Sequence, residues 1–207
     1  MRRLFVLFVL LVVPLGSSAL AQPEVSVRGN VGAAFFQSPD GLNTVLNSGV
    51  NLGVGTAVQV TEGLEIVLEG SYDRFSFNGD TFALFAESVS LESEVDGGDF
   101  NVQNLTLGVR YTFTNQSDVH PYFAGGVGVY RPVLERATVS ESDQMLPRRS
   151  TVTNGYHAAI GSEFLVNETY SVFMEPRVVI VDTDGSELQV DTSTRYVTVQ
   201  LGAEVRF

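Results

Sequence analysis

Apolar and polar residues alternate with a period of two in one segment of this chain after another, which restricts it to an all-β fold. The last segment shows the pattern most clearly. Its aliphatic face carries Val197, Val199, Leu201, Ala203, Val205 and Phe207, and its polar face carries Tyr196, Thr198, Gln200, Gly202, Glu204 and Arg206. Because successive side chains of a strand point to opposite sides, such a segment predicts a strand with two chemically different faces.

The sequence predicts eight strands of this kind and no amphipathic helix. They cover residues 24–36, 48–60, 64–77, 100–113, 120–131, 152–164, 170–182 and 194–207. Their connections alternate between tight turns (near 61–63, 115–118 and 167–168) and long loops (near 37–47, 78–99, 132–151 and 183–193). Turns at one end and loops at the other are typical of an antiparallel up-and-down transmembrane β-barrel.

The second long loop leaves one alternative open. Val89, Leu91 and Val95 alternate with polar residues there. They either extend the third and fourth strands or form an additional hairpin, which would make a barrel of ten strands.

The N-terminal segment has the pattern of a secretory signal peptide. Arg2 and Arg3 precede an apolar stretch at 4–15, and Ala19 and Ala21 form the small-x-small motif that precedes a cleavage site. We therefore expect residues 1–21 to be removed and residues 22–207 to form the barrel domain. The mature part contains no apolar run near the roughly 20 residues that a membrane-spanning helix needs.

Glycine on the polar face indicates which face of the barrel meets lipid. The residues are Gly32, Gly53, Gly55, Gly108, Gly126, Gly128, Gly161 and Gly202. Exposed glycine weakens a strand, whereas inside a narrow barrel it makes room for long side chains from neighbouring strands. We therefore predict that the polar face points inward and that the aliphatic face points into the membrane.

Nine charged residues fall on the predicted inward face. They are Arg28, Glu65, Glu69, Arg110, Glu163, Glu175, Arg177, Glu204 and Arg206. Opposite charges away from water are tolerable when they are paired, and an eight-stranded interior is just wide enough for side chains. The favoured interpretation is an ion-pair network that plugs the barrel, and the alternative is a charged conduit for ions or small solutes.

Aromatic residues gather near the predicted strand ends, as in the interfacial girdles of membrane barrels. They are Phe35, Tyr72, Tyr111, Phe113, Tyr122, Phe123, Tyr130, Tyr156, Phe164, Tyr170 and Phe207.

Composition excludes several other functions. The formal charge is -12, and all twelve basic residues are arginines, so the chain lacks the basic footprint of a nucleic-acid-binding protein. It has no cysteine for a disulfide or a thiolate metal site. The two histidines, His120 and His157, fit no catalytic pattern. We expect no enzymatic activity, cofactor or metal.

Several sequence segments resemble those of a known protein family: "LTLGVRYTF" (105–113), "PYFAGGVGVY" (121–130), "AAIGSEF" (158–164), "VFMEPRV" (172–178) and the terminal "VQLGAEVRF". With them, residues 24–207 resemble the small outer-membrane β-barrels of the OmpX, OmpA-transmembrane and opacity-protein type. The resemblance implies a Gram-negative outer-membrane location, contact with outer-membrane lipid and lipopolysaccharide, and an unidentified extracellular ligand.

The resemblance also implies a role for the chain. It predicts a structural or surface-interaction function through the long loops, in membrane integrity, adhesion or environmental contact, with a narrow porin-like channel as the alternative. Recognition of the last strand by the barrel-assembly machinery is implied for Val199, Leu201, Ala203, Val205 and Phe207.

The signal peptide gives a direct prediction. The mature protein isolated from the outer membrane should begin at Gln22, as measured by intact-mass spectrometry. Replacing both small residues, in Ala19→Arg/Ala21→Arg, should leave the precursor uncleaved. A mature chain that retains residues 1–21 would contradict the assignment.

Overall fold

A computed structural model describes residues 24–38, 46, 48–77, 95–139, 144–183 and 193–207. The predicted signal peptide and residues 78–94 lie outside these ranges. The strands are β1 (Val25–Ser38), β2 (Gly49–Thr61), β3 (Leu64–Phe75), β4 (Val95–Gly97), β5 (Phe100–Thr112), β6 (Val119–Leu134), β7 (Ala137–Val139), β8 (Gln144–Leu146), β9 (Arg149–Ser150), β10 (Thr153–Leu165), β11 (Tyr170–Val181) and β12 (Thr194–Arg206). No helix in the described ranges is long and apolar enough to cross a membrane.

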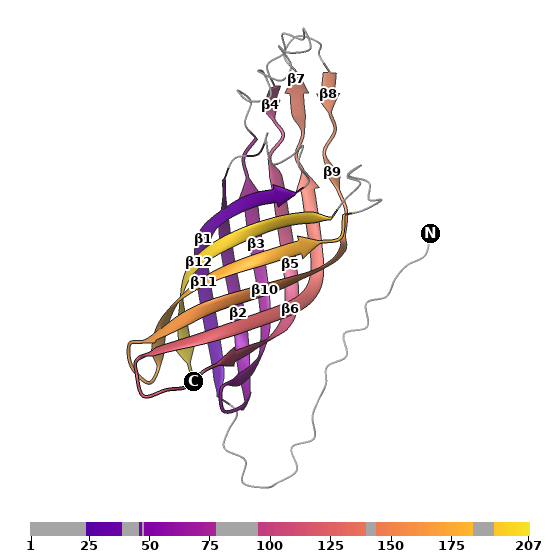
Figure 1. Cartoon of the computed structure of the whole chain (residues 1–207). Coiled ribbons are helices and arrows are strands. Elements are labelled where there is room, and N and C mark those ends of the chain that lie inside the picture. The colour runs from indigo at the N-terminus through magenta and orange to yellow at the C-terminus, as the bar shows by residue number, and fades with distance from the viewer. Residues whose placement is uncertain (1–23, 39–45, 47, 78–94, 140–143, 184–192) are drawn as a thin grey trace.

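Eight antiparallel strands close into one barrel (Figure 1). The order runs β1-β2-β3-β5-β6-β10-β11-β12, and β12 pairs with β1 to complete the ring. The eight-stranded barrel is therefore confirmed, with strand ends within a few residues of those predicted. The ring joins every strand edge to a neighbour, so the backbone groups of the wall are paired along the ladders.

The ten-stranded alternative is wrong. The extra strand β4 does not enter the ring but pairs with β7, which pairs with β8, in a separate three-stranded sheet. This sheet stands beyond the barrel at the end that carries the long loops (Figure 1). We call this end the loop end, and the end that carries the tight turns the turn end.

The first tight turn depends on a glycine. Gly63 has a φ of 74°, a left-handed conformation that costs glycine little because it has no Cβ. Its carbonyl accepts a hydrogen bond from the amide of Thr112 at 2.8 Å, which ties the turn to β5.

The two faces of the wall are oriented as predicted. The aliphatic face is outside, where Val54 and Leu201 are 62% and 59% exposed. The polar face is inside, where Asn51 and Glu204 are each 1% exposed. The barrel is thus the reverse of a water-soluble one, which has an apolar interior and a polar exterior.

Inward glycines lie against large inward side chains of adjacent strands. A Cβ on Gly161 would come within 2.3 Å of the Tyr122 ring, and one on Gly202 would come within 2.3 Å of the Phe173 ring. Gly55 lies directly between Arg28 on β1 and Glu69 on β3 in the strand registers. The glycines therefore provide the space that the long and aromatic side chains occupy.

Not all of the interior is polar. At the loop end, Phe36 packs edge-on against Phe75 and Phe100 with ring centroids 5.4 and 5.6 Å apart, and Phe75 packs against Tyr196 at 5.4 Å. Ala34, Leu46, Val102, Tyr130, Val179 and Val181 complete this aromatic core.

The predicted girdle is wrong at two positions. Tyr122 and Tyr130 are 3% and 1% exposed and point inward, because they share the inward phase of Gly126 and Gly128 on β6. The outward aromatics include Phe35, Tyr111, Phe113, Phe123, Tyr156, Phe164, Tyr170 and Phe207.

The close packing at the inward glycines is testable. Gly202→Ala should lower the free energy of unfolding in lipid vesicles by about 1–3 kcal/mol, because the methyl group would meet both the Phe173 ring and the backbone oxygen of Gly29. Gly53→Ala is the matched control, since the atoms its Cβ would meet belong to the flexible Asn30 side chain. Equal losses for the two variants, measured by urea titration, would contradict this account.

Candidate functional site

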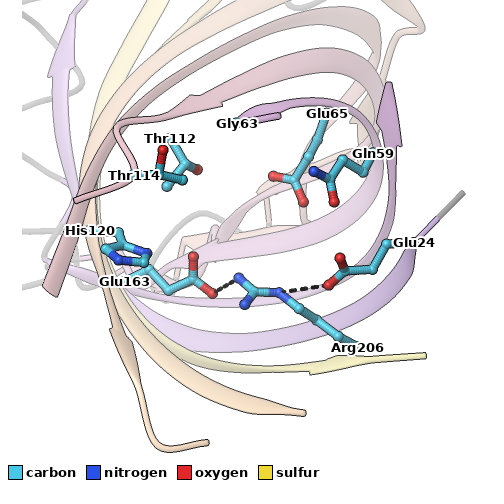
Figure 2. Close-up of a pocket in the computed structure, with 9 residues that line it drawn as sticks. All are labelled: Glu24, Gln59, Gly63, Glu65, Thr112, Thr114, His120, Glu163 and Arg206. Carbon is cyan, nitrogen blue, oxygen red and sulfur yellow. Dashed lines mark hydrogen bonds and ion pairs between the residues drawn. The ribbon is translucent and has the colours of Figure 1, made fainter. Parts of the chain in front are cut away.

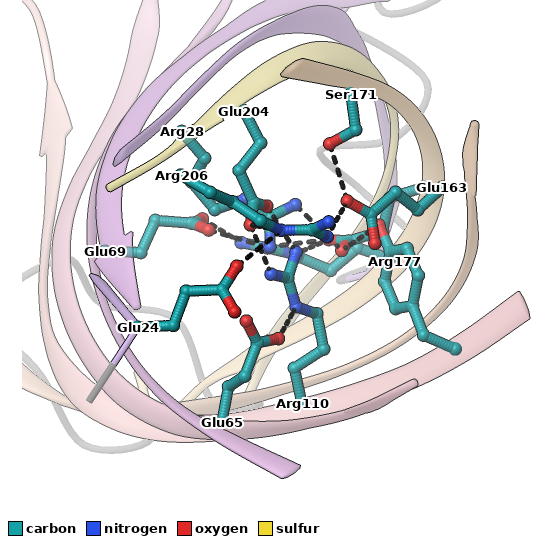
Figure 3. Close-up of polar contacts among 12 residues, drawn as sticks. Glu24, Arg28, Glu65, Glu69, Arg110, Glu163, Ser171, Arg177, Glu204 and Arg206 are labelled. Atoms are coloured by element: carbon teal, nitrogen blue, oxygen red, sulfur yellow. Dashed lines mark hydrogen bonds and ion pairs between the residues drawn. The ribbon is translucent and has the colours of Figure 1, made fainter. Parts of the chain in front are cut away.

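The inward charges form two groups of ion pairs, one around Arg110 and one around Arg177, which the Tyr122 side chain joins into one network in the half of the barrel nearer the turn end (Figure 3). The structure places all nine predicted residues in it, and seven of them are 5% exposed or less. Six barrel strands contribute to it, because the inward positions of β1, β3, β5, β10, β11 and β12 converge on the barrel axis.

Arg110 is fully buried and joins three strands. Its guanidinium donates two hydrogen bonds to the Glu204 carboxylate, at 2.7 and 2.8 Å, and another to Glu65. Its Cζ lies 5.6 Å from the centroid of the Tyr122 ring. The bidentate geometry suits a planar guanidinium and fixes β5 against β12 across the interior.

Arg177 connects opposite sides of the barrel. It donates to both oxygens of Glu69 on β3 and forms a 2.7 Å ion pair with Glu175, its neighbour on the inward face of β11. Arg28 reaches the same Glu175 at 3.5 Å and lies over the Phe173 ring at 4.0 Å from the centroid. The Tyr122 hydroxyl donates to Glu175 at 2.9 Å.

Arg206 completes the network at the turn end. It pairs with Glu163, which also accepts a hydrogen bond from Ser171 at 2.5 Å, and it lies 3.5 Å from Glu24. Sequence reasoning missed Glu24, which stands just before β1. Its even spacing from Arg28 was the available signal, because residues two and four apart share a strand face.

Asp73 is a second inward acid that sequence reasoning missed. It alternates with Glu69 along β3 but lies nearer the loop end, where Asn51 donates to it at 2.6 Å and the Tyr196 hydroxyl at 2.9 Å. No ion pair joins Asp73 to any residue in the described ranges. Because Tyr196 also packs on Phe75, Asp73 connects the charged half of the interior to the aromatic core.

The interior between the charge network and the aromatic core is filled. The cavity beside the network, among Arg28, Glu69, His157 and Arg177, measures about 10 Å³. That is close to the space for a single water molecule.

A larger pocket of about 190 Å³ opens at the turn end (Figure 2). Its lining residues are Glu24, Gln59, Gly63, Glu65, Thr112, Thr114, His120, Glu163 and Arg206. Arg206 extends across it between Glu163 and Glu24, so the network forms the inner boundary of the pocket (Figure 2).

The two histidines lie apart. His120 lines the pocket at the turn end, and His157 lies on the inward face of β10 beside Gly126. Within the described part of the chain, no group of three or more histidine, aspartate or glutamate side chains is placed to hold a metal ion.

The five residues of the implied assembly signal all follow the outward phase of β12. Val199, Leu201 and Phe207 are 40%, 59% and 77% exposed. Their strand pairs with β1 on one side and β11 on the other, so it is the strand that closes the ring.

A closed barrel with an aliphatic outer wall and a filled polar interior is the architecture of a transmembrane β-barrel. The sequence matches the outer membrane protein beta-barrel domain family over residues 5–207. The chain belongs to this family and is an outer-membrane protein. No curated protein matches the sequence.

Three solved structures show the same fold at low sequence identity. Neisserial surface protein A has a TM-score of 0.60 and 17% identity, covering 88% of this chain and 97% of its own. A major outer membrane protein from Thermus thermophilus gives 0.55 and 15%, covering 88% and 99%. Ail, the attachment invasion locus protein of Yersinia pestis, in complex with the heparin analogue sucrose octasulfate, gives 0.53 and 15%, covering 90% and 100%.

The network predicts a large effect at its centre. Arg110→Met should lower the free energy of unfolding by about 3–5 kcal/mol, because it removes both close guanidinium contacts of the buried Glu204 carboxylate and leaves it, among the described cations, only the 3.9 Å contact with Arg206. Adding Glu204→Gln should restore part of the loss. The comparison is Arg148→Gln, which removes an exposed pair with Glu135 and should change stability little. The interpretation fails if urea titration in vesicles gives Arg110→Met and Arg148→Gln equal effects.

Proposed function

We propose that this protein is a non-conducting outer-membrane anchor that holds its long loops at the cell surface for structural or adhesive contact. The observation that carries the proposal is the filled interior. A solute entering from the turn end would meet Arg206 and the network around Arg110 and Arg177, and then the aromatic core around Phe75.

The two layers oppose passage by different physical means. In the charged layer, the guanidinium groups are engaged by carboxylates from other strands, so passage of an ion would require several buried pairs to separate. In the aromatic core, an ion would lose its hydration without gaining polar contacts. Either layer alone would be a barrier, and together they support a structural role for the charges.

The loop end supports the surface-contact part of the proposal. Residues from two different long connections form the sheet of β4, β7 and β8, which extends beyond the barrel (Figure 1). Among the similar structures are a neisserial surface protein and an attachment invasion locus protein. By analogy, we propose that the loops, rather than the barrel wall or the interior, contact the extracellular partner.

Two further roles belong to the proposal. The outward face of β12 would serve as the signal for the barrel-assembly machinery, and the exposed side chains of Leu201 and Phe207 would be part of it. The protein would have no catalytic activity, because its inward acids are committed to arginines or hydrogen-bond donors.

Conductance separates the anchor from the alternative, a narrow channel for ions or small solutes. The folded full-length protein in planar lipid bilayers should give no stable open-state current at a voltage at which a known open porin, measured in parallel, conducts. Arg206→Gln should remain closed as well, since the aromatic core lies beyond it. Large, stable currents from the unmodified protein would overturn the anchor and support the channel.

A further inference from the structure

The charged residues on the outer wall are distributed unevenly. Along the barrel strands, the outward positions in the described ranges are uncharged until the loop end. There, three strands that are not neighbours in the ring each expose an arginine: Arg74 on β3, Arg131 on β6 and Arg195 on β12. We call these three residues the arginine belt.

Two residues of the belt, Arg131 and Arg195, lie at the same distance along their strands from the turn end. Arg195 is twelve residues from Phe207, and Arg131 is twelve from Val119, where β6 begins. At about 3.3 Å per residue and a strand tilt near 45°, this separation is roughly 28 Å along the membrane normal. The apolar band of such barrels is about 25 Å tall. When the turn-end residues lie at one headgroup layer, Arg131 and Arg195 therefore lie at the other.

Two of the three guanidinium groups are available for a ligand. Arg131 and Arg195 are exposed, and neither forms an ion pair with any residue in the described ranges. Arg74 is bound to Asp99 at 2.6 Å but keeps 55% of its side chain exposed. Asp182, just beyond the end of β11, is an exposed acid at this level.

The turn end is chemically different. Its outward side chains include the aromatic cluster of Tyr111, Phe113 and Phe123, with ring centroids 5.1–5.6 Å apart. The charged residues of its exposed turns are acids, Glu62, Asp118 and Glu168. Within the described ranges, the positive charge of the outer wall thus lies at the loop end of the barrel strands.

We propose that the arginine belt binds the phosphate groups of the lipid in the outer leaflet, with Arg131 and Arg195 as its main contacts. Charge complementarity carries this assignment: exposed cations stand at headgroup height on a wall whose other outward strand positions, within the described ranges, are uncharged. The inference is independent of whether the interior conducts, so it stands or falls apart from the proposed function.

The residue type fits phosphate. A guanidinium is planar, stays charged, and can donate two parallel hydrogen bonds to one phosphate group. Each arginine close to an anionic lipid surface changes binding roughly fivefold. Loss of Arg131 and Arg195 together should therefore weaken retention of the lipid by roughly 25-fold.

The experiment uses the folded full-length protein in phosphatidylcholine vesicles that contain either bisphosphorylated lipid A or its dephosphorylated form. Lipid retained after extraction is measured by native mass spectrometry, and the heat-modifiable gel shift reports folding. The variants are Arg131→Gln/Arg195→Gln and, as a control with a similar exposed side chain, Arg136→Gln, which lies above the barrel between β6 and β7.

We expect the unmodified protein and Arg136→Gln to retain bisphosphorylated lipid A and the double variant to lose it. The dephosphorylated lipid should be retained weakly by all three. Equal retention by the double variant, or equal retention of the two lipids, would overturn the proposal. So would competition by millimolar inorganic phosphate, which would show that the belt binds a free anion rather than a lipid headgroup.

Discussion

The structure depends on the need to pair every backbone amide and carbonyl in a medium without water. A sheet can meet this requirement in a membrane if it closes on itself, and β12 closes this one by pairing with β1 and β11. Closure with eight strands then fixes the interior width, so that side chains fill it. The glycines, the charge network and the aromatic core are three consequences of that narrow width.

The interior also shows how a polar core can be stable behind an apolar wall. Buried charges are costly unless their hydrogen-bonding capacity is met. Here Arg110 and Arg177 each engage two carboxylates, and the carboxylates come from strands on different sides of the barrel. The same pairs that remove the cost of burial also brace the barrel across its axis. The same contacts therefore stabilise the interior and fill its space.

Much of the fold could be predicted because its signals are local. A period of two fixes which residues share a face, and glycine on the polar face indicates which face is inside. Tight turns such as that at Gly63 set the hairpins. Errors arose where an outcome depended on more than one strand. The stretch that contains Val95 gave no indication that it would pair with β7 from a different loop. Alternation along β6 indicates that Tyr122 and Tyr130 point inward. Their position near predicted strand ends led instead to the wrong prediction that they belong to the outward aromatic girdle.

The sequence by itself determined where the eight barrel strands lie, which face of each points inward, and nine of the inward charges, because each follows from neighbours two residues apart. The tertiary structure decided which charges meet, since the stagger between strands sets the depth of each side chain in the barrel. That stagger brings Arg177 to Glu69, 108 positions away in the chain. It also separates Asp73 from the arginines and places it beneath Tyr196. In the same way, alternation identifies Arg131 and Arg195 as outward residues, but the closed and tilted barrel brings them to one level at the membrane surface.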